Sequence, residues 1–245
     1  MSSDIVSSII KFNAQTNGRD KVCRLFQYGC RLAWGRLQYK DKKDLIQTVK
    51  NIESMLSMTR KLLRFGKSLD FLQGALKSIH LKDIVLRLTI TLSKINQAFY
   101  LLFDHFLWFN TVGAVKLDRQ YWGEVSARFY FATLILNFIR DLYGIWCVIK
   151  EELAVRKARM SSSSYKNGDA NYQSLNRRPA TMLEISQQNI PLILDTIKNL
   201  FDLPIPLCTL KYMQLSPTKQ GIFGLVSSLV AVATVWNPNL KLVPS

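Results

Sequence analysis

The sequence predicts an all-α fold, a multi-helix membrane-associated bundle with amphipathic helices and a C-terminal hydrophobic helix. Apolar residues recur every three or four positions along most of the 245-residue chain, and alternating strand-like patterns are scarce. Hydrophobic residues make up 48% of the chain, yet its net charge is +16, a combination typical of proteins at anionic membrane surfaces. A stretch of 21 uncharged residues, 220–240, is about as long as a membrane span requires.

The apolar spacing and the glycine and proline positions predict where the helices begin and end. Helices are expected near 4–15, 18–38, 41–66, 68–79, 83–113, 119–158, 181–202 and 217–236. Gly18 and Gly113 mark expected breaks. Residues 159–180 contain four consecutive serines and no apolar period, which predicts a flexible linker. The linker divides a basic helical region, 1–158, from a C-terminal helical hairpin, 181–245.

The positive charge is concentrated before the linker. Residues 1–160 carry a net charge of +13, and the remaining residues carry +3. Such a basic region indicates a polyanionic partner, either nucleic acid or anionic lipid. No zinc-finger spacing, RNA-binding aromatic motif or basic zipper is present, and large apolar residues alternate with the cations. A phospholipid membrane is therefore the expected partner, and nucleic acid is not.

The segment 60–84, RKLLRFGKSLDFLQGALKSIHLKDI, predicts contact with lipid when it is read as a helix. Its apolar residues fall within an arc of about 100°, as expected for a helix that lies on a membrane. The predicted membrane-inserting face consists of Leu62, Phe65, Leu69, Leu72, Leu76 and Ile79. The predicted contacts with anionic lipid are Arg60, Lys61, Arg64, Lys67 and Lys82. The alternative is that this stripe packs on a neighbouring helix, which is the commonest use of an apolar stripe.

The membrane segment is expected at 217–240. Its small residues would allow close contact with another helix, and they are Gly221, Gly224, Ser227, Ser228, Ala231 and Ala233. The segments 88–112 and 127–149 are also apolar, but they carry charges that cost about 2.5–3.5 kcal/mol each at a bilayer centre. They are expected to be buried in protein or to lie at the interface, unless the helices bundle. Neighbouring Arg140 and Asp141 point about 100° apart, so each is expected to pair with another helix.

The residues that carry enzyme chemistry are missing from any recognisable arrangement. Two histidines stand outside acid–base and nucleophile motifs, and no phosphate-binding or dinucleotide glycine motif occurs. The cysteines Cys23, Cys30, Cys147 and Cys208 have no metal-ligand spacing and are expected to be reduced thiols. We therefore expect no catalytic residue, no cofactor, no metal site and no enzymatic activity.

Four motifs in order resemble the eleventh peroxin family, the peroxisomal membrane-elongation proteins. They are KFNAQTNGRDKVCRLFQY at 11–28, RKLLRFGKSLDFLQGALKSIHLKDIVLRLTITLSKIN at 60–96 with Asp104 and Trp108 beyond it, RDLYGI at 140–145 and GIFGLVSSL at 221–229. The resemblance covers roughly 1–158 and 203–245. It implies a peroxisomal membrane protein that inserts the helix at 60–79 to curve and elongate the peroxisome and to promote its division and proliferation.

The resemblance also implies partners and topology. The family self-associates and works with dynamin-type fission machinery and its adaptors. Both termini of the family are generally assigned to the cytosol, which requires an even number of membrane spans.

Two other functions stay open at this point. One is a peroxisomal membrane channel for small metabolites, lined by Lys94, Asp104, Arg128, Arg140 and Asp141. The other is a passive scaffold that recruits fission factors through its basic N-terminal helices.

Overall fold

The computed structural model describes residues 2–38, 42–164 and 181–244, and this part of the chain is helical with no strand. The all-α prediction is thereby confirmed. The helices are α1 (Ser2–Ala14), α2 (Thr16–Leu37), α3 (Lys43–Leu63), α4 (Lys67–Ser78), α5 (Ile84–Val112), α6 (Arg119–Ser164), α8 (Met182–Gln188), α9 (Ile190–Asp202), α10 (Pro204–Thr209), α11 (Pro217–Trp236) and the short 3₁₀ helix η1 (Pro238–Leu240).

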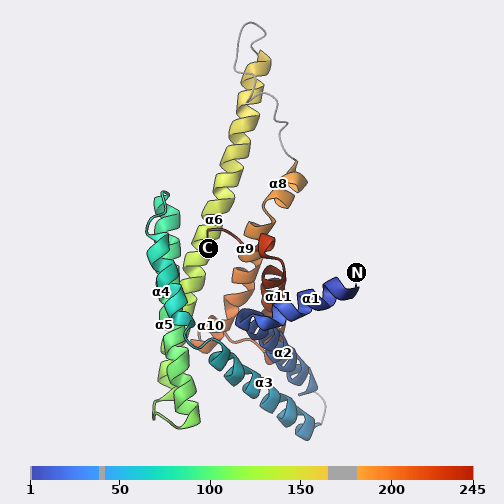
Figure 1. The fold of residues 1–245 in the computed structure, drawn as a ribbon, viewed down its shortest axis with the longest axis vertical. Coiled ribbons are helices and arrows are strands. Elements are labelled where there is room, and N and C mark those ends of the chain that lie inside the picture. The colour runs from blue at the N-terminus through green and yellow to red at the C-terminus, as the bar shows by residue number, and fades with distance from the viewer. Residues whose placement is uncertain (1, 39–41, 165–180, 245) are drawn as a thin grey trace.

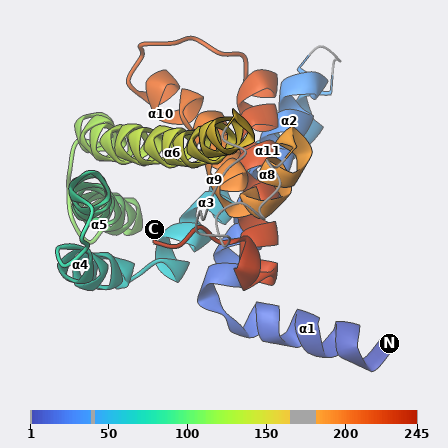
Figure 2. The same ribbon diagram turned by 90° about the horizontal axis from the view of Figure 1, so that it is seen from above.

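The helices form two layers. Helices α4, α5 and α6 stack in one layer, while α2, α3, α9 and α11 form the other, and α1 projects away from both (Figure 2). Helices α5 and α6 make an antiparallel hairpin (Figure 1), which turns at Gly113 in the left-handed conformation, with φ +87°. This is the break that the sequence predicts there.

Other boundaries differ from the predicted ones for local reasons. The expected break at Gly18 lies inside α2, and the chain bends at Gln15 instead. A Cβ on Gly18 would lie 2.2 Å from the carbonyl oxygen of Phe12, so this glycine permits a close approach. The helix expected at 181–202 divides at Asn189, because Pro191 begins a new helix.

The segment 60–84 is not one continuous helix. Helix α3 ends at Leu63, and Gly66 adopts a left-handed conformation with φ +78° before α4 begins. At the other end of the basic region, α6 continues to Ser164 and includes the four serines expected in the linker. The rest of that linker lies outside the described residues.

Helix α11 packs antiparallel against α2 through its small residues. The buried residues of α11 are Gly221, Gly224, Ser227, Ser228 and Ala231, as expected for a close contact between helices. A Cβ on Gly224 would lie 2.1 Å from the ring of Tyr28, and one on Gly221 would lie 2.7 Å from the backbone of Leu32. Helix α9 packs on both α6 and α11. Regions 1–158 and 181–245 therefore interleave in one bundle and do not form separate units.

The bundle buries many polar side chains beside its apolar core and exposes many large apolar ones. Charged and polar side chains are buried between the helices, among them Asp20, Arg24, Gln27, Glu53, Asp104, Asp141, Asn199 and Asp202. Large apolar side chains cover the outside, among them Ile84, Leu88, Leu92, Phe99, Ile139, Leu142, Trp146, Ile222 and Leu229. Extensive exposed apolar surface marks contact with a membrane or a partner.

Within the described residues, two helices are long and apolar enough to cross a bilayer, by length and composition. They lie within Arg119–Ala158 and at Pro217–Trp236, and only 22% and 28% of their most apolar windows are buried in the bundle. The second agrees with the expected segment at 217–240. The first contains 127–149, which the sequence placed in the protein interior or at an interface.

Two of the charges in α6, Arg140 and Asp141, are paired inside the bundle, whereas Arg128 is exposed. The Arg140 guanidinium donates to Asp141 Oδ1 at 2.7 Å and also pairs with Asp195 on α9. The amide nitrogen of Asn199, also on α9, donates to Asp141 Oδ2 at 2.7 Å. Arg140 and Asp141 thus pair directly, against expectation, because the long arginine side chain reaches back to its neighbour. The expected partners on a second helix are also present.

Candidate functional site

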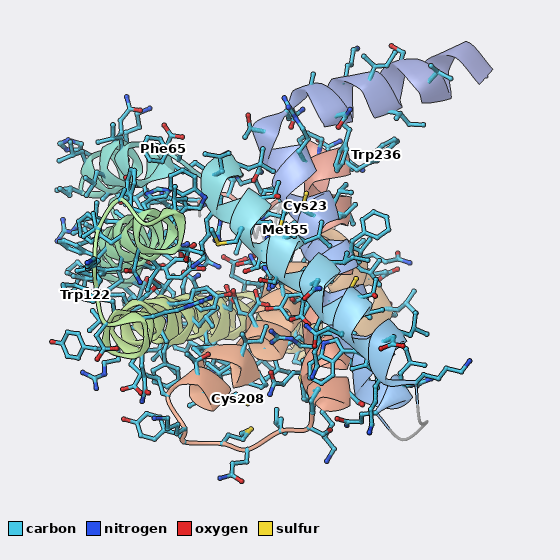
Figure 3. The ribbon with its side chains drawn as sticks, turned by 90° about the horizontal axis from the view of Figure 1, so that it is seen from below. Cys23, Met55, Phe65, Trp122, Cys208 and Trp236 are labelled. Atoms are coloured by element: carbon cyan, nitrogen blue, oxygen red, sulfur yellow. The ribbon has the colours of Figure 1, made fainter. Side chains whose placement is uncertain are left out.

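The predicted membrane-inserting residues lie together on the outside of the molecule. All six are exposed, and we call them the apolar strip: Leu62, Phe65, Leu69, Leu72, Leu76 and Ile79. Leu69 and Leu76 are the most open, at 69% and 64% exposed. Figure 3 labels Phe65 where α3 passes into α4. The Phe65 ring also contacts His105 and Phe109 on α5, with ring centroids 5.0 Å and 6.2 Å away, while the leucines of the strip remain exposed among the described residues.

Helix α4 turns its small residues inward and its large ones outward. Ala75 and Ser78 are buried, and the Ser78 hydroxyl lies 3.0 Å from that of Thr91 on α5. A Cβ on Gly74 would lie 3.2 Å from the side chain of Lys94, so glycine lets α5 approach closely here. The strip is therefore presented outward because the opposite face of α4 is the one that fits α5.

The cations at the end of α3 point into the protein. Arg60 donates to Asp20 Oδ1 at 3.2 Å and to the Gln27 side-chain oxygen at 2.7 Å. Arg64 donates to Asp104 Oδ2 at 2.7 Å, and the Lys61 ammonium lies 3.1 Å from Asp104 Oδ1. These ion pairs join α3 to α2 and to α5.

This geometry corrects the placement of the predicted lipid-binding cations. Arg60, Lys61 and Arg64 were expected on the membrane-facing surface, but their side chains are only 11–16% exposed and are paired with carboxylates. Lys67 is half-buried and donates to the Asn17 side-chain oxygen at 3.1 Å. Lys82 is exposed, as expected. Lys77, which the prediction omitted, is also exposed on α4 beside the strip.

Sequence reasoning missed that Asp20 and Asp104 are the carboxylates that hold these cations. Burial alone would raise the pKa of Asp20, but Lys21, Arg60, Arg64 and Lys67 together hold that pKa well below its usual range. Asp20 therefore stays ionised under all ordinary conditions. The available signal was the isolation of Asp20 and Asp104 within strongly basic or apolar stretches.

The chain is similar to a known family along nearly its whole length. The model of the family Peroxisomal biogenesis factor 11 (PEX11) matches residues 6–236. The chain belongs to the PEX11 family. It is 34% identical to Peroxisomal membrane protein 11B of Homo sapiens, over 96% of this chain and 98% of that protein. It is 32% identical to Peroxisomal membrane protein 11A of Homo sapiens, over 97% and 99%.

Similarity extends to a protein from a distant organism. Peroxisomal membrane protein 11 homolog of Dictyostelium discoideum is 28% identical over 96% of this chain. No solved structure matches the chain significantly. Membership of the PEX11 family makes this a peroxisomal membrane protein with a role in peroxisome biogenesis, and the relatives are named as membrane proteins and not as enzymes.

Proposed function

We propose that this PEX11-family protein curves and elongates the peroxisomal membrane by inserting the apolar strip into one leaflet, and that it thereby promotes peroxisome division and proliferation. The observation that carries the proposal is the exposure of all six strip side chains, of which Leu69, Leu72 and Leu76 lie at three- and four-residue spacing on α4. Exposing these large apolar side chains to water costs free energy, and a lipid monolayer would remove that cost by covering them.

The energetics favour shallow insertion. Full burial of six large apolar side chains is worth on the order of 10 kcal/mol, and interfacial burial realises roughly half of that. Exposed Lys77 and Lys82 flank the strip, and each cation near an anionic surface adds about 1 kcal/mol. The inserted face reaches only about 5–10 Å deep, so it expands one leaflet and leaves the other unchanged. Repeated along an oligomer, this asymmetry favours a tubular bilayer.

The rest of the exterior supports anchoring. Helix α11 is a candidate span that would anchor the protein, and the exposed apolar residues of α5 and α6 add surface for lipid. Helix α4 runs alongside α5 and α6 (Figure 1), so insertion of the strip into one leaflet requires that whole layer to lie along the membrane surface. Self-association and contact with dynamin-type fission machinery and its adaptors belong to this proposal, because tubulation requires many copies and fission requires a scission enzyme.

The channel hypothesis receives less support from the arrangement of charges. Asp104, Arg140 and Asp141 are held in ion pairs. Charges paired in this way stabilise the contacts between helices and do not line an open pore. The scaffold hypothesis uses the same exposed strip for a protein partner. It differs from membrane insertion in that the purified protein would then leave vesicle shape unchanged.

Reconstitution of the full chain into anionic vesicles tests the proposal. Electron microscopy should show tubules with the unmodified protein and spherical vesicles with the double variant Leu69→Glu, Leu76→Glu. The control is Gln73→Glu, which adds a charge to an exposed position of α4 without removing an apolar side chain. Tubules formed by the double variant at the normal yield would refute the mechanism.

A further inference from the structure

A cavity of about 360 Å³ lies between the two layers, behind the apolar strip. Its wall is formed by residues of α2, α3, α4, α5, α6 and α10. Figure 3 shows side chains from both layers meeting in this region. The volume falls in the range of sites that bind small molecules, about 300–1,000 Å³.

The lining of the cavity is strongly positive. Its cations are Lys21, Arg24, Arg60, Arg64 and Lys67, and its carboxylates are Asp20 and Asp104. Two of these groups have charged partners just outside the lining, Asp202 for Arg24 and Lys61 for Asp104. Six cations thus face three carboxylates, which leaves a net charge of +3 around a half-open cavity. A partly buried excess of positive charge favours an accompanying anion.

Arg24 supplies the most direct sign of a missing partner. The residue is only 8% exposed, and its Nη2 donates to Ser227 Oγ at 3.0 Å and to Asp202. Its Nε is buried and has no hydrogen-bond partner among the described residues. Buried donors are almost always satisfied, so the Nε of Arg24 leaves one hydrogen bond unmet in a residue that lines the cavity.

We propose that this cavity binds a phosphate-bearing anion. Three guanidinium groups at one site suit the planar, multidentate recognition of phosphate oxygens, and two ammonium groups add charge without a fixed geometry. A phosphomonoester carries close to two negative charges at neutral pH, which offsets most of the local excess. Apolar residues also line the cavity, including Leu101, Leu107 and Ile205, and they would contact the carbon skeleton attached to the phosphate.

The same phosphate chemistry occurs in phospholipid headgroups and in soluble metabolites. The test therefore uses two probes with an identical phosphomonoester, dihexanoyl phosphatidic acid and glycerol 3-phosphate. The full chain is held in nanodiscs of neutral lipid, and binding is measured by titration calorimetry. At least one probe should bind, while dihexanoyl phosphatidylcholine, which has no net charge, should not.

Variants connect the binding to the cavity. Arg24→Gln should weaken binding roughly tenfold, and Lys67→Gln, at a half-buried position of the wall, should weaken it about threefold. The matched control is Lys77→Gln, which removes the same charge from the same helix outside the cavity and should leave binding unchanged. Circular dichroism establishes that each variant is folded. If Arg24→Gln does not fold because Asp202 loses its partner, Lys67→Gln decides the outcome.

The outcomes are distinct. Binding of the short-chain lipid alone, lost in the variants, supports a headgroup site, and binding of both probes supports recognition of phosphate from either source. Failure of both probes to bind overturns the proposal, as does binding that Lys67→Gln and Lys77→Gln affect equally. The proposal is independent of strip insertion, because vesicle tubulation and probe binding are measured separately.

Discussion

The apolar strip and the charged cavity wall are built from the same stretch of sequence, 60–79, yet they obey opposite rules. The strip presents its leucines outward, whereas Arg60 and Arg64, a few residues away, point inward to Asp20 and Asp104. An amphipathic segment of a membrane protein thus need not turn its cations to the lipid headgroups. The location of the paired carboxylates decides which way the charged face points.

The largest expected effect comes from removing a carboxylate that pairs with the cations of α3. Asp104→Ala leaves Lys61 without its carboxylate and Arg64 with only the longer 3.6 Å contact to Asp20, in a site that is largely removed from water. The loss should cost about 3–5 kcal/mol in the free energy of unfolding. Chemical denaturation in detergent measures this loss. The control Asp70→Ala removes an exposed carboxylate from α4 and should change little. Equal stability of the two variants would show that the ion pairs do not hold α3 on α5.

The next effect concerns the contact that closes the second layer. Gly224→Leu places a side chain where the Tyr28 ring lies, so α11 must move away from α2 at a cost of about 1–3 kcal/mol. Thermal unfolding followed by circular dichroism measures the change. Gly29→Leu on α2 is the matched control, since a Cβ there meets nothing within 4 Å. A Gly224→Leu protein as stable as the control would contradict the close packing.

Truncating a leucine of the apolar strip should weaken membrane binding and leave the stability of the fold unchanged. Leu69→Ala should change the free energy of unfolding by less than about 0.5 kcal/mol, because the side chain is exposed. Affinity for anionic vesicles should fall about fivefold, which corresponds to half-burial of a leucine. Vesicle co-sedimentation provides the measurement, with Gln73→Ala as control. A loss of stability without a loss of vesicle affinity would mean that the strip faces protein.

The smallest effect is a pH dependence of the cavity. Burial lowers the pKa of Lys21 to about 8, with Asp20 opposing this shift and Arg24, Arg60 and Arg64 adding to it. Lys21 therefore loses its positive charge as the pH rises from 7 to 9, while a phosphomonoester, whose second pKa is about 6, keeps its negative charge. Binding of glycerol 3-phosphate should weaken about threefold over this range. Lys21→Arg should abolish the dependence, and an unchanged pH profile in that variant would exclude Lys21 as its source.

Periodicity was sufficient to predict the helices, the strip and the small-residue face of α11, because each depends on residues within a few turns of one another. Periodicity could not predict which carboxylates pair with the cations. Asp20 and Arg60 are 40 residues apart, as are Arg64 and Asp104, and no local pattern links them. The direct pair of Arg140 and Asp141 was missed for a different reason, since backbone angles do not describe the reach of a flexible guanidinium side chain.

The length of α6 has a consequence of its own. Its 46 residues extend about 69 Å, more than twice the roughly 30 Å of a hydrocarbon core. The last turns, 150–164, extend about 22 Å beyond the apolar segment 127–149. Figure 1 shows this end of α6 rising clear of the bundle. A factor that bound there would contact the chain well away from the apolar surface of the bundle.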